Sequence, residues 1–292
     1  MVRRRNRLIA GLVSGLLTLA VSLSAAGVPL SECFPLERLD PSLRPEAEQL
    51  LLKALDSEAL FTIVGGLKPI SSSWVTAKIN VDAPDWRESE RIRRIVQTFR
   101  CGQELSATIQ PFWRVYGTDR SLDGFFLHHG AVARTVAAHP ETFAFFGVSP
   151  ASDPIQVLMA FEVDATPRRN RAYGYLFGYP RHAVDFFVES EALSRRTGKF
   201  VERDFFNIPV FERPTNRFVY AVPKGHTANA EDLALRDGAA AILADYRARR
   251  ANYIGPGKRG VVALIRDWFD DGKGHCSPDT ALRKVRGLAT QR

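Results

Sequence analysis

The loop at residues 64–73 (VGGLKPISSS) combines residue types that could bind a ligand or catalyse acyl transfer. Gly65 and Gly66 allow the backbone to approach a ligand closely, Lys68 supplies a charge, and Ser72 is one of three serines that supply hydroxyl groups. A serine beside a buried lysine can act as a nucleophile, although the S-x-x-K spacing typical of such enzymes is absent. This loop is therefore a candidate ligand-binding segment. The alternative is a turn between two strands.

Two neighbouring histidines, His128 and His129, follow the apolar run GFFL. Metal ligands must converge on one point, whereas adjacent residues of a strand point to opposite faces of its sheet. The chain also lacks H-E-x-x-H and comparable metal-binding spacings. We therefore predict no metal site. A capping role is favoured for these histidines, and His128 remains a candidate general acid or base.

His182 lies in a predicted helix with Asp185 and Glu189, at spacings i, i+3 and i+7 that place the three on one face. A histidine beside two carboxylates can transfer protons or contribute to a metal site. The other face would carry Phe186 and Phe187, so an amphipathic helix with a solvated polar face explains the same pattern. That second interpretation is favoured.

Lys224 and His226 follow the predicted strand 217–222, where a strand leads into a helix. Binding and catalytic residues often lie in such connections, and a lysine with a histidine is a reactive combination. Both are therefore candidate catalytic residues. In the alternative interpretation the segment only leads to Asn229, which caps the next helix.

Residues 255–260 (GPGKRG) match the G-x-G-x-x-G pattern of dinucleotide-binding proteins. That pattern requires a preceding strand, whereas a helix is predicted before this segment, so no nucleotide cofactor and no other cofactor is expected. The amides of the following helix N-terminus, together with Lys258 and Arg259, could instead hold an anionic group. A tight turn between two helices is the alternative.

Three cysteines, Cys33, Cys101 and Cys276, follow the N-terminal segment. In an oxidising compartment this number predicts one disulfide and one spare thiol, and the sequence does not determine which two residues pair. A catalytic thiol lacks any supporting local signature.

The elements that would position these residues are strands early in the chain and longer helices later. Strands are predicted at 59–64, 74–81, 105–113, 124–127 and 217–222, helices at 45–56, 85–99, 229–250 and 261–268, and a solvated loop at 166–171 (TPRRNR). This order predicts an α+β fold, with an early antiparallel or mixed sheet covered by a mostly helical C-terminal two-thirds. No internal boundary is evident, so residues 27–292 are expected to form a single unit.

The N-terminus carries four arginines within its first seven residues, followed by an uncharged stretch from Leu8 to Leu30. Ser24, Ala25 and Ala26 supply a small-residue cleavage site, so residues 1–26 are predicted to be a signal peptide. The alternative is an uncleaved anchor, the one case in which membrane contact is expected. Four of the 40 basic residues and none of the 32 acidic ones lie in this segment, so the net charge of +8 falls to +4 on its removal. Such a charge gives no reason to expect nucleic-acid binding.

These observations lead to three hypotheses for an exported, periplasmic or extracellular protein. The first is a protein of the cell envelope that binds an anionic ligand or partner through its glycine-rich loops. The second is a hydrolase or transferase acting on envelope material through lysine, histidine and serine residues. The third is a scaffold or assembly factor of an envelope complex, with the partner itself unknown. The first is favoured, because every catalytic motif considered fails on spacing.

Overall fold

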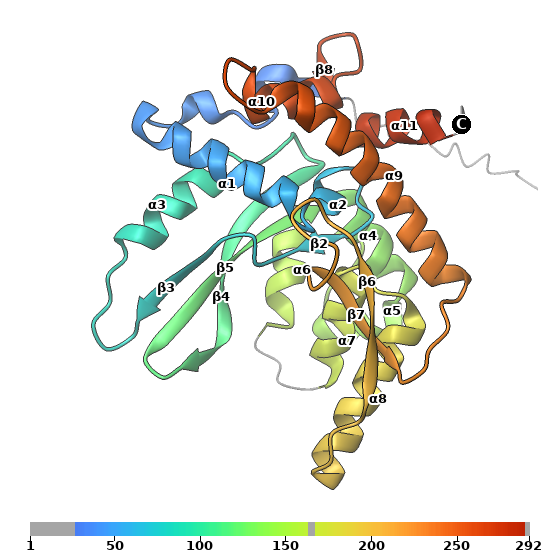
Figure 1. Cartoon of the computed structure of the whole chain (residues 1–292). Helices are drawn as coiled ribbons and strands as arrows, with labels where there is room; N and C mark the ends of the chain where they lie inside the picture. Colours follow the sequence, from blue (N-terminus) through green and yellow to red (C-terminus); the bar gives the residue numbers. More distant parts are fainter. Residues whose placement is uncertain (1–26, 163–166, 290–292) are drawn as a thin grey trace, which may run out of the picture.

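The chain folds into an α+β structure in which an antiparallel sheet lies between two hydrophobic cores (Figure 1). The computed structural model describes residues 27–162 and 167–289, and the predicted signal peptide at residues 1–26 lies outside them. The main sheet comes from the N-terminal half and helices predominate toward the C-terminus, which confirms the predicted fold class. Among the described residues, no helix is both long enough and apolar enough to cross a membrane.

The main sheet is built around β5 (Asp119–His128). The long strand β4 (Leu105–Tyr116) pairs antiparallel with one edge of β5, with an irregularity between Pro111 and Val115 where the register shifts. The short strands β2 (Ile70–Ser71) and β3 (Thr76–Asn80) pair with residues 126–127 and 119–123 on its other edge. The turn between β4 and β5 includes Gly117, whose φ of 60° is readily adopted only by glycine.

Both faces of this sheet are covered, and the sequence of β5 reflects this. Successive residues of a strand point to opposite faces, so Phe126 packs in the first core while Phe125 and Leu127 pack in the second. A strand buried on both faces appears in the sequence as a continuous apolar run, as GFFL does.

The first core lies under the helices at the two ends of the chain, which Figure 1 shows side by side above the sheet. Its largest fully buried side chains include Trp74, Phe99, Tyr246 and Trp268. Most of its helical residues come from α1 (Arg44–Asp56), α2 (Leu60–Ile63), α3 (Arg87–Val96), α9 (Ala230–Tyr253), α10 (Gly260–Phe269) and α11 (Pro278–Ala289). The predicted helices at 45–56, 229–250 and 261–268 are therefore present.

The second core lies on the other face of the sheet, under five consecutive helices. These are α4 (His129–Ala138), α5 (Pro140–Phe143), α6 (Pro154–Ala160), α7 (Pro167–Leu176) and α8 (Arg181–Thr197). A Cβ on Gly174 would lie 2.8 Å from a methyl group of Val184, so this glycine lets α7 and α8 pack closely. A separate antiparallel pair, β6 (Arg203–Ile208) and β7 (Phe218–Pro223), packs against α8.

Cys33 and Cys101 form the disulfide, and Cys276 is a buried free thiol. Cys276 belongs to the short strand β8 (His275–Cys276), which pairs with β1 (Val28–Pro29) near the start of the described chain. Burial raises the pKa of the Cys276 thiol to about 12. It is therefore protonated at neutral pH, which argues against a role as a nucleophile.

Two local predictions are wrong. Residues 60–63 form the helical turn α2 and not a strand. The run is buried on every side, including its one polar residue, Thr62, so no exposed polar face reveals its period. Pro167 begins α7 inside the stretch predicted to be a solvated loop. The basic residues of that stretch lie beside aromatic rings and a buried carboxylate, which the local sequence does not reveal.

Candidate functional site

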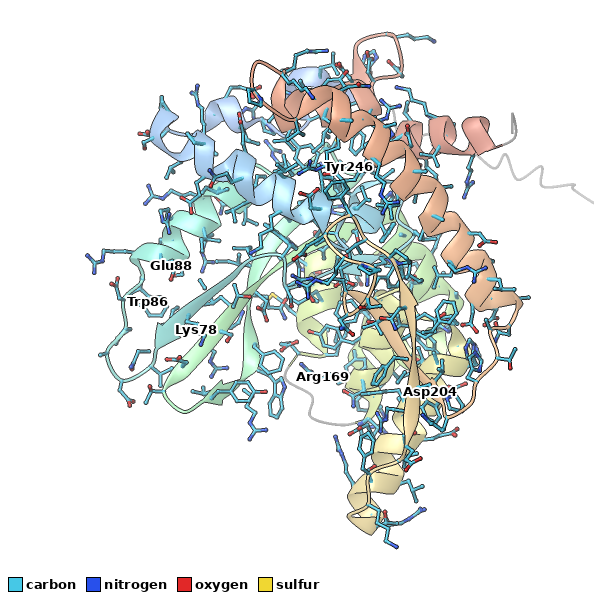
Figure 2. The ribbon with its side chains drawn as sticks, viewed as in Figure 1. Lys78, Trp86, Glu88, Arg169, Asp204 and Tyr246 are labelled. Carbon is cyan, nitrogen blue, oxygen red and sulfur yellow. A yellow bond between two sulfur atoms is a disulfide. The ribbon has the colours of Figure 1, made fainter. Side chains whose placement is uncertain are left out.

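A cavity of about 460 Å³ lies between the sheet, helices α7 and α8, and the β6–β7 pair. Its lining includes Gln110, Asp123 and Phe125, which share the sheet face that bears the second core. In Figure 2, Arg169 of α7 lies in the region between this sheet and β6, and β6 can be found by its labelled residue Asp204. The volume falls within the range of small-molecule binding sites, roughly 300–1,000 Å³.

Most of the cavity lining is apolar, and aromatic rings contribute much of it. Tyr173 stacks on Phe177 with ring centroids 5.5 Å apart, and the rings of Tyr179 and Tyr220 lie at the same centroid distance but are tilted by 46°. The full aromatic set is Phe112, Phe125, Tyr173, Phe177, Tyr179, Phe187, Phe205 and Tyr220. Such walls favour a ligand with an aromatic or hydrocarbon body, because transfer of apolar surface from water stabilises the complex by about 25 cal/mol per Å².

Arg203 is the main charged group at the β6 side of the cavity. Its side chain is only 6% exposed, and its Nη1 lies 3.7 Å from Glu191. The guanidinium also packs over Phe200, 4.5 Å from the ring centroid, and its Nε donates to the Val201 carbonyl. Its Nη2 is buried and has no hydrogen-bond partner. A buried donor of this kind costs about 1–3 kcal/mol unless an acceptor is supplied.

A second arginine, Arg169, lies at the α7 side of the cavity and pairs with the Glu162 carboxylate. Arg169 Nη2 donates to Glu162 at 3.1 Å, and Glu162 also accepts the Trp113 amide at 2.9 Å and the Tyr173 hydroxyl. Burial, followed by the bond to Glu162, raises the pKa of Tyr173, so its hydroxyl stays protonated. Arg169 Nε, like the side-chain oxygen of Gln110, is buried without a partner. The residues that line this mainly apolar cavity thus include two hydrogen-bond donors, Arg203 Nη2 and Arg169 Nε, and one acceptor, the Gln110 side-chain oxygen, that have no partner in the protein.

A second, more polar cavity of about 570 Å³ lies at the start of α4 and α11. It contains Glu104, whose pKa burial raises and whose carboxylate accepts from Ser277 at 2.6 Å. His128 also lines it and caps α4, with Nδ1 accepting from the Ala131 amide at 3.3 Å. Burial lowers the pKa of His128 to about 4, so its ring is neutral at neutral pH. The capping role expected for this histidine is therefore present.

The first part of the predicted ligand loop, up to Ser71, is packed against the rest of the protein. Lys68 is fully buried, with Nζ 2.7 Å from Glu58 and 4.2 Å from the Phe218 ring centroid. Burial lowers the pKa of this lysine. Gly65 and Gly66 have φ values of 77° and 61°, and a Cβ on Gly66 would lie 2.8 Å from the His128 ring. Packing against neighbouring elements accounts for both glycines.

The remaining predicted site residues are dispersed. Ser72 lines the first cavity and His128 the second, whereas Lys68, Lys224 and His226 line neither. Lys224 forms an exposed ion pair with Asp204 at 2.8 Å, and His226 lies against Asp232. At the start of α10, Lys258 donates to the Ala251 carbonyl and Arg259 pairs with Asp267.

Sequence reasoning missed Arg203, Arg169 and Glu162. The one local signal was the spacing of Arg169 and Tyr173 at i, i+4, which places the two side chains side by side on a helix. Nothing in the sequence around Arg203 indicates burial, because the aromatic rings that cover it come partly from another element.

Comparisons of the chain with protein-family models, curated proteins and solved structures gave no match. The chemistry of the cavity and its neighbouring groups is therefore the basis for assigning a function.

Proposed function

We propose that this chain is an exported protein that binds an amphipathic ligand in the first cavity. The ligand would have an aromatic or hydrocarbon body and an anionic group, such as a carboxylate or a phosphate. The observation that carries the proposal is Arg203, a buried arginine with an unpaired Nη2 beside a cavity lined by aromatic rings. An anionic group within reach of Nη2 would supply the missing acceptor.

The sequence analysis favoured a protein that binds an anionic ligand through its glycine-rich loops, and the proposal keeps anion binding but places it at Arg203 and the first cavity. Lys68 and Arg259 each have a carboxylate partner, and Lys258 is bonded to a backbone carbonyl. An anion would have to compete with these partners. Arg203 also has a carboxylate neighbour, since Glu191 lies 3.7 Å from its Nη1, but its Nη2 makes no hydrogen bond and is the donor left for an anion.

A pair of fluorescent dyes tests the assignment. Anilinonaphthalene sulfonate is an aromatic anion, and phenylnaphthylamine has the same ring system without the sulfonate. Replacing Arg203 by methionine is expected to weaken sulfonate-dye binding by about tenfold or more, because a hydrogen bond to a charged group contributes roughly 1.5–3 kcal/mol. Binding of the uncharged dye should change by less than about threefold, since the apolar walls remain. Fluorescence titration of both dyes gives the dissociation constants.

The matched control is Arg236→Gln, which removes an exposed arginine that pairs with its neighbour Asp237. It should leave both affinities unchanged. Ala221→Leu, which narrows the cavity, should weaken both dyes. Circular dichroism confirms that each variant is folded. Equal losses of sulfonate-dye affinity for Arg203→Met and Arg236→Gln would exclude Arg203 as the anion contact. No effect of Ala221→Leu on either dye would exclude the cavity as the binding site.

Export of the protein is supported by two independent features. The first 26 residues have the composition of a signal peptide, and Cys33 and Cys101 form a disulfide of the kind that persists in oxidising compartments. Expression of the full chain in a bacterial host should yield a mature protein that begins at Gly27. N-terminal sequencing of the protein from the periplasmic fraction checks this, and a chain that retains Arg3 would point to an uncleaved anchor.

A further inference from the structure

His182, His226 and Asp232 come together from three different elements beside the β6–β7 pair. His182 lies in the first turn of α8, His226 follows β7, and Asp232 lies in the first turn of α9. One possible ligand atom from each residue lies within 4.8 Å of the other two. Neither Asp185 nor Glu189, which the sequence placed on one face with His182, belongs to this cluster, and Asp185 pairs with Arg171 instead.

The Asp232 carboxylate is held in place by the surrounding protein. It is fully buried and accepts hydrogen bonds from the Tyr220 hydroxyl at 2.5 Å and from the Asn229 amide at 3.0 Å. Asn229 in return caps α9 by accepting from the Glu231 and Asp232 amides. The position of the carboxylate is thus fixed by the same capping box that starts the longest helix.

The two imidazole rings face this carboxylate in different ways. His226 Nε2 lies 2.7 Å from Oδ2 and forms a hydrogen bond. His182 Nε2 lies 3.2 Å from Oδ1, but it is buried and has no partner that satisfies hydrogen-bond geometry. In a tetrahedral zinc site with nitrogen and oxygen ligands about 2.0–2.1 Å from the ion, adjacent ligand atoms are roughly 3.3 Å apart. The spacing of His182 Nε2 and Oδ1 fits two ligands directed at a common ion.

The contacts behind these residues also fit a metal site. His182 Nδ1 lies 3.3 Å from Asn229 Nδ2 and 3.4 Å from the Glu231 carboxylate. With an ion on Nε2, the ring would carry its proton on Nδ1 and donate to Glu231, as metal-bound histidines commonly do to a carboxylate. The Tyr220 hydroxyl orients Asp232 in the same manner. His182 and His226 are 26% and 15% exposed, so an ion and one water molecule can reach them from solvent.

We propose that His182 Nε2, His226 Nε2 and the Asp232 carboxylate bind a divalent transition-metal ion of the zinc type. Two imidazoles and one carboxylate suit this class of ion, and three protein ligands leave a fourth position for water. On binding, the ring proton of His226 moves from Nε2 to Nδ1 by exchange with solvent, so the neutral ring offers its Nε2 electron pair to the ion. The hydrogen bond between His226 and Asp232 is then replaced by one bond from each residue to the ion. Tyr220 also lines the first cavity, so the ion would lie behind one wall of the proposed ligand site.

Titration of the mature protein with Co²⁺ and Zn²⁺ tests this proposal. The protein is purified without a histidine tag, treated with a chelator and dialysed, and each metal is added alone. We expect one Co²⁺ per chain with the intense visible absorption of tetrahedral coordination, and displacement of that absorption by Zn²⁺. His182→Gln and His226→Gln should each weaken metal binding by at least tenfold, because each removes one of three ligands.

The matched control is His275→Gln, since His275 is an exposed histidine that also lies near a carboxylate, Asp271. Its affinity for Co²⁺ should stay within about threefold of the unmodified protein. Both ligand variants retain Asp232 and its cap, and two separate variants guard against loss of the fold in one. Absence of Co²⁺ binding to the unmodified protein would overturn the proposal, as would a larger effect from His275→Gln than from either ligand variant.

Discussion

Glu58→Gln is expected to lower the free energy of unfolding by about 3–5 kcal/mol, because it leaves the charge of Lys68 buried without its partner. The Lys68 side chain is fully buried and Glu58 is only 14% exposed, with 2.7 Å between their charged atoms. Contact with the rings of Phe218 and Phe177 compensates part of the cost of burying the ammonium but does not replace a carboxylate. Denaturant unfolding of the variant and the unmodified protein at neutral pH measures the difference.

The pH dependence of the stability of Glu58→Gln provides a second test of whether the buried charge of Lys68 causes the loss. Burial lowers the pKa of Lys68 below its ordinary value of 10.5, so the folded protein releases this proton at a lower pH than the unfolded chain. Stability therefore rises as the pH increases through this window. The loss caused by Glu58→Gln should accordingly shrink as the pH approaches 10.5, since loss of the Glu58 charge promotes deprotonation of Lys68.

Two further variants distinguish a buried pair from a simple loss of contacts. Lys68→Met in the Glu58→Gln background should recover much of the lost stability, because an apolar side chain of similar length removes the unpaired charge. Lys224→Met, which breaks the exposed pair with Asp204, should change the stability far less than Glu58→Gln, because solvent screens an exposed pair. A loss below about 1 kcal/mol for Glu58→Gln would show that the Lys68 charge does not depend on this carboxylate.

The fold was predictable where one element shows its own period or its own cap. The helix from Asn229 could be predicted because its apolar residues repeat with helical spacing and a good capping residue precedes them. The short run at residues 59–64 could not be assigned, because burial on all sides removes the alternation that distinguishes a strand from a helix.

The candidate sites depend on contacts between elements, and this limits what one sequence can reveal. His182 and His226 were each singled out, yet nothing in their spacing brings them to Asp232, since α8 and the β7–α9 connection meet only in the folded chain. Arg203 illustrates the same limit more strongly. Its burial results from Phe187 and Phe200, which lie on or after a different helix, and from the short strand pair that was only half predicted.

Acidification is expected to remove about 3 kcal/mol of stability through His128 alone. Burial lowers the pKa of this histidine from 6.5 to about 4, and each unit of pKa shift corresponds to about 1.4 kcal/mol. The unfolded chain therefore takes up the proton first as the pH falls. The contribution of His128 is fully present above pH 6.5 and is lost as the pH falls toward 4.

The structural cause of this sensitivity is the cap of α4. His128 Nδ1 must keep a free electron pair to accept the Ala131 amide, while Nε2 is buried and without a hydrogen-bond partner. Protonation of Nδ1 would break the cap and place a charge in a site that is only 3% exposed. Asp279, 3.8 Å from Nε2, favours the charged ring, but burial is the larger effect.

His128→Asn separates this residue from the other groups that titrate in the same range. Asparagine can still cap α4 but does not titrate, so the variant should be less stable at neutral pH and should lose about 3 kcal/mol less than the unmodified protein between pH 6.5 and 4. Glu104 and His129 are present in both proteins, so their titration cancels when the two pH dependences are subtracted. His275→Gln, which changes an exposed histidine, should keep the slope of the unmodified protein. If His128→Asn lost stability as steeply as the unmodified protein, the acid sensitivity would have to come from another group, and the neutral cap of α4 would not be its cause.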